Sequence, residues 1–504
     1  MRGSAGELLS DPLEADRAAV GALGCVFAVG AAGLLVVGLG FFASGSLYCW
    51  LPASWAGAEA GTRASATTAR SAASSVRITA VLVADLLDMS ARSVATSSVH
   101  RLGVPMEART PPRAKSVALV HDFLLDLRGA ERVFLEMCDL WPDAPIFTAV
   151  YDEHGTEGRF AGRDVRTSFL QRLRPDARTF RGLLPLYPAA IESFDLSEFD
   201  VVVSSSSAWA HAIICDEQTT HVCYCHNPFR YAWNDRDRTL AARRDPISRA
   251  VLRTLFHRWR QWDWIAAQRV DSYVANSRMT RGRVRAYFGR DAHVVYPPVD
   301  TGRFEPRQPG DHYLVLSELM PHKRIDVAVQ AFSAMRLPLV VAGDGPDARR
   351  LRAMAGPTVR FVGRVSDAEV ADLLATCQAL VVTAVEEFGI AAVEAQAAGR
   401  PVISVGAGGA LETVVDGVTG RLWQGGAEEL ARAVRDFDAG TVDTSECLRS
   451  AARFDRSVFR RALPREVERA LEGQPSHAPP QHATPRPQRP ALRLARRGRP
   501  RPFV

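Results

Sequence analysis

Residues 385–423 read VEEFGIAAVEAQAAGRPVISVGAGGALETVVDGVTGRLW, and this stretch holds two loops that each follow an apolar run. An apolar run at 379–383 leads into a loop and a helical pattern, and an apolar run at 401–405 leads into the glycine-rich turn at 406–409. Short apolar strands that alternate with helices are typical of a parallel sheet. Such sheets bind ligands at the carboxyl ends of their strands. The stretch therefore predicts an α/β fold with binding loops directly after these two strands.

The alternation continues on both sides of this stretch. Helical patterns separate most of the other apolar runs, which lie at residues 116–121, 201–204, 222–225, 272–275, 313–316, 337–342 and 359–362. Strands that alternate with helices form doubly wound sheets, so we expect two Rossmann-like domains that face each other across a central cleft. The first occupies residues 115–300 and the second residues 301–455, and a terminal helix follows at 456–472.

The composition excludes several other classes of protein. A chain of 504 residues is too long for one hydrophobic core. Its 47% hydrophobic and 23% charged residues exclude a largely disordered chain and a polytopic membrane protein, and its eight cysteines are too few for a disulfide scaffold. The net charge of +6 belongs to residues 473–504, which hold seven arginines and no acid and are expected to be a disordered tail. We therefore expect no nucleic-acid partner.

The N-terminal extension, residues 1–110, leaves two interpretations open. Residues 18–58 contain no charged side chain, and the apolar segment at 18–43 is long enough to span a bilayer as a helix. A signal peptide fits poorly, because Glu7, Asp11 and Glu14 precede this segment. The extension is then either a single-pass membrane anchor followed by a linker, or an upstream piece that the working protein lacks or leaves unstructured.

Two carboxylates of the opening stretch are candidate ligand-binding groups. Glu386 follows a strand, and Glu394 lies eight residues later in a helix that begins near Gly389. The free backbone N–H groups at Phe388, Gly389 and Ile390 form the N-terminal end of that helix, which attracts anions. Two carboxylates beside such an end suit a ligand that carries several hydroxyl groups and a phosphate.

The pattern of glutamate, seven residues and glutamate resembles family 4 of the retaining glycosyltransferases, which have the GT-B fold. The resemblance covers residues 115–455. It implies that Glu386 contacts the sugar of a nucleotide-sugar donor and that Glu394 contacts the ribose. Residues 314–332 resemble the segment that opens the family's donor domain, and Lys323 matches the lysine that meets the diphosphate.

One position of this segment departs from the family. Many members have an arginine where this chain has Glu318, and a carboxylate there would repel the diphosphate if it pointed inward. Either Glu318 faces away and Arg324 helps Lys323 to neutralise the diphosphate, or donor binding is weakened.

The first half carries two further parts of the resemblance. His226 lies in CYCHNPFRYAW, residues 223–233, which resembles the family's His-x-Pro motif and implies a histidine that faces the donor sugar and the acceptor. The loop LRGAE, residues 127–131, resembles the glycine-rich first loop, where Gly129 allows a ligand to approach the backbone closely. Cys223 and Cys225 beside His226 lack a fourth zinc ligand at finger spacing, so no metal site is expected.

The resemblance implies a retaining, metal-independent hexosyltransferase. We expect it to move mannose, with GDP-mannose as the donor, onto a saccharide or lipid-linked acceptor in the synthesis of a cell-envelope polysaccharide or glycolipid, without a further cofactor. The arginine-rich segment at 163–187 either lies on a membrane surface or packs with a solvated charged face. We expect a cytoplasmic protein, peripheral at the inner face of the plasma membrane. The alternatives are a catalytically weak GT-B binding or assembly subunit, and a GT-B nucleotide-sugar epimerase or phosphorylase.

Overall fold

The computed structural model describes residues 24–30, 33–41, 47–50, 116–177 and 179–473. Residues 1–109 and 110–504 are two separate units. Almost all of the tail expected at 473–504 lies outside the described residues, as does the linker before residue 110.

The described part of the first unit is a small antiparallel sheet. Its three strands pair in the order β1-β2-β3, with β1 at Gly24–Gly30, β2 at Gly33–Phe41 and β3 at Leu47–Trp50. A membrane-spanning helix was one of the two interpretations of the segment at 18–43, and the described residues of that segment are strands. Its frequent glycines lower helix propensity, and its valines favour strands. No helix in the described part of the chain is long and apolar enough to cross a membrane.

The second unit begins with a parallel sheet of seven strands in the order β10-β9-β8-β7-β4-β5-β6. The strands are β4 (Val117–His121), β5 (Ile146–Thr148), β6 (Val165–Thr167), β7 (Val201–Ser206), β8 (Thr220–Cys225), β9 (Ser272–Ala275) and β10 (His293–Val294). Its helices are α2 (Gly129–Leu140), α3 (Tyr187–Glu192), α4 (Arg236–Ala241), α5 (Pro246–Ala267) and α6 (Arg278–Phe288), with short 3-10 turns η1 (Phe169–Leu173), η2 (Phe180–Leu186) and η3 (Ala210–Ala212). The central strands β7 and β8 are almost wholly buried, as expected for a parallel sheet that helices cover on both faces.

A second parallel sheet follows, with six strands in the order β13-β12-β11-β14-β15-β16. The strands are β11 (Tyr313–Leu316), β12 (Leu339–Ala342), β13 (Val359–Gly363), β14 (Leu380–Val382), β15 (Val402–Val405) and β16 (Gly420–Trp423). Its helices are α7 (Ile325–Met335), α8 (Ala348–Met354), α9 (Asp367–Thr376), α10 (Ile390–Ala397), α11 (Ala410–Thr413), α12 (Ala427–Asp436) and α13 (Thr444–Ala452), with turns η4 (Thr301–Arg303), η5 (Pro321–Lys323) and η6 (Ala439–Thr441). The predicted fold class, two Rossmann-like doubly wound domains, is confirmed.

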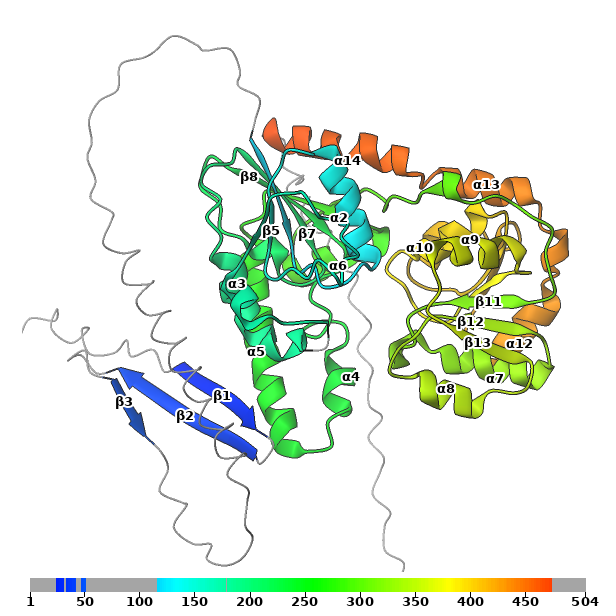
Figure 1. The fold of residues 1–504 in the computed structure, drawn as a ribbon, viewed down its shortest axis with the longest axis horizontal. Helices are drawn as coiled ribbons and strands as arrows, with labels where there is room; N and C mark the ends of the chain where they lie inside the picture. The colour runs from blue at the N-terminus through cyan, green and yellow to red at the C-terminus, as the bar shows by residue number, and fades with distance from the viewer. Residues whose placement is uncertain (1–23, 31–32, 42–46, 51–115, 178, 474–504) are drawn as a thin grey trace, which may run out of the picture. The chain divides into compact units, whose positions relative to one another are not determined.

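The last helix, α14 (Arg456–Leu471), returns to the first domain and lies beside α2, as Figure 1 shows in orange and cyan. Phe459, Leu463 and Val467 of α14 are buried in the same hydrophobic cluster as residues of β4, β7 and β8. The two segments that connect the domains lie side by side, because Val299 and Asp455 form a parallel β-bridge. The C-terminal segment therefore completes the core of the N-terminal domain.

Candidate functional site

A cleft of about 990 Å³ lies between the two domains. Its walls are the loops that follow strands β4, β7 and β8 of the first domain and strands β11, β12 and β14 of the second. These are the carboxyl ends of parallel strands, where the sequence predicted binding loops. The lining includes seven of the nine candidate site residues: Gly129, His226, Lys323, Glu386, Phe388, Gly389 and Ile390. The remaining two, Arg324 and Glu394, are not part of it.

Lys323 and Glu386 form an ion pair at the wall of the second domain. The Lys323 Nζ atom donates to both carboxylate oxygens of Glu386, at 2.7 and 2.8 Å. The Thr383 hydroxyl holds the backbone of the lysine by donating to the Lys323 carbonyl at 2.8 Å. The pair places one cation and one hydrogen-bond acceptor side by side in the cleft, which suits a ligand with both phosphate and hydroxyl groups.

The turn that carries Glu386 ends at the N-terminus of α10. Gly389 there has a φ of 91°, which favours glycine because a β-carbon would be strained. Phe388 is buried against Tyr296 and Phe454, with ring centroids 5.6 and 5.2 Å apart. These contacts fix the turn, and the first residues of α10 line the cleft.

The glycine-rich turn at 406–409 supports this loop from behind. The Gly409 N–H donates to the Glu386 carbonyl at 2.9 Å. A β-carbon on Gly409 would lie 2.2 Å from the Phe388 carbonyl oxygen, so only glycine fits. The turn is not part of the cleft lining. The second loop of the opening stretch therefore positions the first one.

Glu387 joins the two domains, which the sequence did not predict. Its carboxylate accepts hydrogen bonds from Arg283 Nη1 at 2.8 Å and Arg230 Nη2 at 3.0 Å, both from the first domain. Burial on its own would raise the pKa of Glu387, but the two guanidinium groups bring it below its usual value. Arg230 lies in the motif around His226 and could have been noted from the sequence, but its contact with Glu387 could not be predicted.

Glu394 lies behind the cleft and not in its lining. Its nearest cation is Arg303, whose Nη2 donates to Glu394 Oε1 at 3.3 Å. Burial raises the pKa of Glu394. Arg303 also lies 3.5 Å from Asp367, and Asp367 accepts two hydrogen bonds from Arg132 of α2, each 3.0 Å long. Charged groups thus connect Glu394 to the first domain. Its contact with a ribose stays a prediction.

Arg324 is exposed and adopts a left-handed conformation with φ 50° at the start of α7. Its position outside the cleft lining gives no support to a shared role with Lys323 in charge neutralisation. That part of the prediction has no geometric basis in the described residues.

His226 begins a buried hydrogen-bonded chain. Its Nε2 lies 2.9 Å from Ser205 Oγ, which lies 3.1 Å from His121 Nδ1. The other nitrogen of His121 lies 3.8 Å from Glu131, and Glu131 accepts the Arg128 N–H at 3.0 Å. Burial, with a smaller contribution from His121, lowers the pKa of His226 to about 3, so the ring is neutral at physiological pH.

The donor and acceptor in each of these contacts depend on the tautomers of the two rings. With the His121 proton on the nitrogen that faces Glu131, the Ser205 hydroxyl would donate to His121 Nδ1 and accept from Nε2–H of His226. That arrangement would leave the lone pair on His226 Nδ1 for a ligand. The sequence pointed to His226 alone.

We predict that the free energy of unfolding falls as the solution becomes acidic, because two histidines are buried. Burial lowers the pKa of both His226 and His221 from 6.5 to about 3. Between these values the unfolded chain binds more protons than the folded one, so stability is lost as the pH falls through this window. Each histidine contributes about 1.4 kcal/mol per pH unit. The free energy of unfolding, measured by urea titration at several pH values between about 6.5 and 5, should fall less steeply with decreasing pH in His221→Gln than in the native chain. An equal dependence on pH in the two proteins would contradict the prediction.

Asp122, directly after β4, anchors the loop after β7. Its two carboxylate oxygens accept four backbone N–H groups, from Ser207, Ala208, Trp209 and Ala210, at 2.5 to 3.1 Å. Ser207, Ala208 and Trp209 line the cleft. A buried carboxylate therefore fixes the backbone of this wall. The only sequence signal was an acid at the end of the first strand.

The residues considered for zinc do not cluster. Cys223 and Cys225 are buried strand residues, and burial raises their thiol pKa values well above the usual range. In the part of the chain that the structure describes, no group of three or more His, Cys, Asp or Glu side chains could hold a metal ion.

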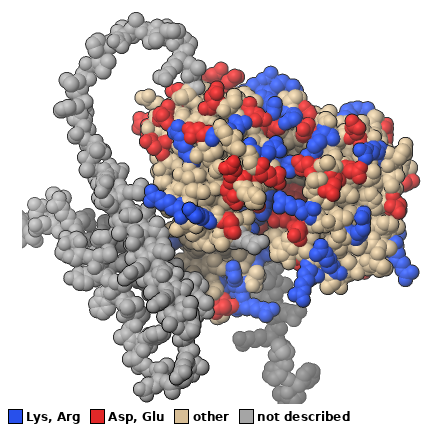
Figure 2. Space-filling view, in the orientation of Figure 1, with Lys and Arg blue, Asp and Glu red and all other residues tan. Residues whose placement is uncertain are grey.

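The arginine-rich segment at 163–187 mixes packed and exposed groups. Arg163 and Arg166 are paired with acids, whereas Arg172 and Arg174 are exposed. Apolar side chains of the same segment pack against the core of the first domain, and Phe180, Arg181 and Leu184 line the cleft. Figure 2 shows acidic and basic side chains mixed over the visible face of the described residues. The contact with a membrane surface stays a prediction.

Two facing Rossmann-like domains, with a charged cleft between the carboxyl ends of their strands, define a protein of the GT-B architecture. Residues 127–303 match the family model described as Glycosyltransferase Family 4, and residues 303–453 match the model described as Glycosyl transferases group 1. The chain therefore belongs to the family 4 glycosyltransferases, and the predicted family is confirmed.

The chain is similar to parts of several curated glycosyltransferases. D-inositol 3-phosphate glycosyltransferase of Streptomyces avermitilis is 31% identical over 221 residues, which are 37% of this chain and 46% of that protein. A GDP-mannose-dependent alpha-(1-6)-phosphatidylinositol monomannoside mannosyltransferase of Mycobacterium tuberculosis is 32% identical over 226 residues, 38% and 56% of the two chains. The chain thus spans about half the length of these relatives. Among solved structures, HepE of Anabaena in complex with UDP is 17% identical, with a TM-score of 0.52 over 70% of this chain and 99% of that one.

Proposed function

We propose that this protein is a retaining, metal-independent glycosyltransferase that moves a sugar from a nucleotide-sugar to a saccharide or lipid-linked acceptor. The observation that carries the proposal is the Lys323–Glu386 pair, which lies in the same interdomain cleft as His226. GDP-mannose is the proposed donor, because the Mycobacterium tuberculosis relative is named as GDP-mannose-dependent. HepE was solved with UDP, which supports a nucleoside diphosphate in this type of cleft.

Each group of the cleft has a role in the proposed reaction. Negative charge builds on the leaving diphosphate, and Lys323 together with the N–H groups at the start of α10 would stabilise it. Glu386 would accept hydrogen bonds from hydroxyl groups of the donor sugar, and the His226 Nδ1 atom would accept one from the sugar or the acceptor. Contacts between the domains would limit the access of water, which would otherwise consume the donor.

The proposal also concerns the acceptor and its location. We propose an acceptor borne by the inner face of the plasma membrane, as part of cell-envelope glycan or glycolipid synthesis. The mannosyltransferase relative is named for a phosphatidylinositol monomannoside acceptor. The long helix α5 carries exposed Ile247, Trp264 and Ile265 among exposed arginines, a composition that suits an anionic membrane surface.

Nucleotides should stabilise the full chain in a pattern that identifies the donor. GDP at 100 times its dissociation constant should add about 2.7 kcal/mol to the free energy of unfolding and raise the melting temperature by a few degrees. A thermal-shift series with GDP, UDP and ADP, each compared with its nucleoside, measures this. A shift with UDP alone would keep the proposed reaction and change the donor. No shift with any diphosphate would contradict the proposal.

Product analysis separates transfer from the alternatives. Incubation with GDP-mannose and either soluble oligosaccharides or lipid-linked saccharides should give a product with the donor's anomeric configuration by NMR, and EDTA should not reduce the yield. Nucleotide binding without transfer to any acceptor would favour the non-catalytic binding or assembly subunit. A changed sugar in the absence of acceptor would favour an epimerase.

A further inference from the structure

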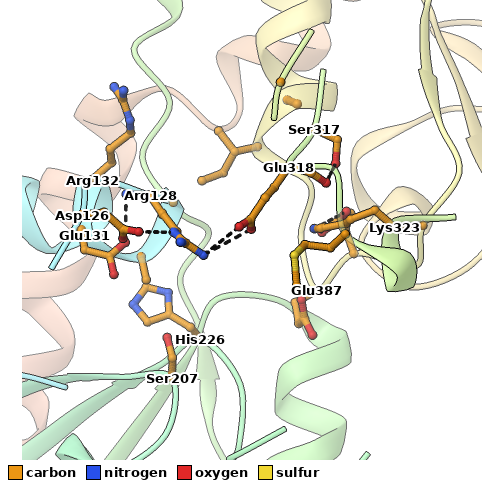
Figure 3. Close-up of a pocket in the computed structure, with 18 of the residues that line it drawn as sticks. Asp126, Arg128, Glu131, Arg132, Ser207, His226, Ser317, Glu318, Lys323 and Glu387 are labelled. Atoms are coloured by element: carbon orange, nitrogen blue, oxygen red, sulfur yellow. Dashed lines mark hydrogen bonds and ion pairs between the residues drawn. The ribbon is translucent and has the colours of Figure 1, made fainter. Parts of the chain in front are cut away.

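Glu318 points into the cleft and contacts the opposite domain. Arg128 Nη1, from the first domain, lies 3.1 Å from Glu318 Oε1 and donates to Oε2 at 3.3 Å. Figure 3 shows the two side chains meeting, with Lys323 on the second domain's side of the same cleft. Of the two alternatives for Glu318, the one in which its side chain faces away from the cleft is therefore wrong. The carboxylate lies in the cleft, and a cation from the other domain neutralises it.

A third residue orients Arg128. Asp126 Oδ2 accepts from Arg128 Nε at 2.6 Å, on the edge of the guanidinium that does not face Glu318. Burial raises the pKa of Asp126, with nearby Glu131 and Glu318 adding to the effect against the attraction of Arg128. The acids Asp126 and Glu318 raise the pKa of Arg128 although burial opposes it. Asp126 thus fixes the plane of the guanidinium and leaves its outer nitrogens directed at the cleft.

The charge of the cleft makes this arginine relevant to an anionic ligand. Six Lys and Arg residues and seven Asp and Glu residues line the cleft, which leaves a net charge of −1. Four of the six cations are already paired with carboxylates, namely Arg128, Arg132, Arg230 and Lys323. A diphosphate that replaced a carboxylate as the partner of one of these four cations would gain a further positive charge in the cleft.

The Arg128–Glu318 pair is suited to such an exchange. Its side chains are 46% and 38% exposed, whereas Glu387 and Arg283 are 16% and 15% exposed. An exposed ion pair contributes little stability, so its partner is replaced at small cost. A guanidinium binds a phosphate group in the same bidentate geometry as a carboxylate. The phosphate carries more negative charge than the carboxylate, so the attraction is stronger.

We propose that Arg128 binds the diphosphate of the nucleotide-sugar, exchanging Glu318 for phosphate oxygens when the donor enters the cleft. The cation that many family members carry at position 318 is then supplied from the first domain. This inference rests on the proposed function. It assigns Glu318 the opposite effect from Arg128: the carboxylate competes with the diphosphate, while the guanidinium holds it.

The two single variants separate this exchange from a fixed contact between domains. Calorimetric titration with GDP and UDP should show that Glu318→Gln tightens diphosphate binding several-fold, and that Arg128→Gln weakens it about tenfold, as expected for the loss of a charged hydrogen bond. A fixed contact would instead respond in the same direction to loss of either partner. Glu318→Arg should rescue Arg128→Gln, and guanosine or uridine, which lack phosphate, should bind all variants alike.

Arg281 and Asp291 provide the matched control. They form an ion pair with side chains 49% and 37% exposed, outside the cleft lining, with hydrogen bonds of 3.0 and 3.1 Å. Arg281→Gln and Asp291→Asn should therefore leave GDP affinity unchanged. If Arg128→Gln and Glu318→Gln shift it in the same direction, the inference is overturned while the proposed function stands. If the native chain binds neither GDP nor UDP, both are overturned.

Discussion

Replacing Lys323 by methionine is expected to lower kcat/KM for glycosyl transfer by at least about a hundredfold, the effect of removing one donor that stabilises transition-state charge. The Nζ atom of Lys323 lies 2.7 and 2.8 Å from the oxygens of Glu386, so the cation is already held in the cleft before a ligand binds. Glu386→Gln should cause a similar loss, because the neutral amide is a weaker acceptor for sugar hydroxyl groups. Steady-state kinetics with the donor and acceptor found by product analysis measures both.

Stability measurements distinguish a lost function from a lost fold. Each single variant leaves one largely buried charge without its partner and should cost about 2 kcal/mol or less. The double variant Lys323→Met with Glu386→Gln removes both charges, so it should regain stability without regaining activity. Arg281→Met breaks an exposed ion pair with Asp291 and should change neither property. Turnover close to the native rate in Lys323→Met would contradict the site assignment.

Asp122→Ala is expected to cost about 4 kcal/mol of stability, a large share of the 5 to 15 kcal/mol typical of a folded protein. The carboxylate accepts four backbone N–H groups within the loop at 207–210, and these would be left unsatisfied in a buried place. Asp122→Asn keeps one carbonyl oxygen and should lose less. Because the chain has two domains, the urea transition of the first domain is the quantity to compare.

Asp195 provides the control for this prediction. It is also an acid that accepts a backbone N–H, but only from Ser197 and at an exposed position. Asp195→Ala should therefore change stability by less than about 1 kcal/mol. An Asp122→Ala variant that unfolds at the same urea concentration as Asp195→Ala would show that the loop does not depend on the carboxylate.

The sequence predicted the parts of the site that depend on strand ends. Strand periodicity placed His226 and Glu386 after parallel strands, and the structure brings their loops to the same cleft. The partners of charged groups were not predictable, because they depend on how two separately wound domains face each other. Glu318 was noted only as a departure from the family pattern and Glu387 was not a candidate, yet both contact arginines of the other domain.

Two further differences have local physical reasons. Glu394 follows Glu386 by eight residues, but its direction on α10 takes it to Arg303 and away from the cleft lining. The apolar composition of residues 18–43 made a spanning helix one of two interpretations, but apolar character does not distinguish a helix from strands when glycine and valine are frequent. The described residues there are β1 and β2.

The return of α14 to the first domain sets an order for the folding of the chain. Phe459, Leu463 and Val467 share a core cluster with Leu119 and Val203, so the N-terminal domain is completed by a segment that is made only after the whole second domain. During synthesis this domain must wait, with an apolar surface uncovered, while the whole second domain emerges and folds. The second domain can close its own core without that delay. Translation speed and chaperone supply should therefore affect the yield of this protein mainly through its N-terminal half.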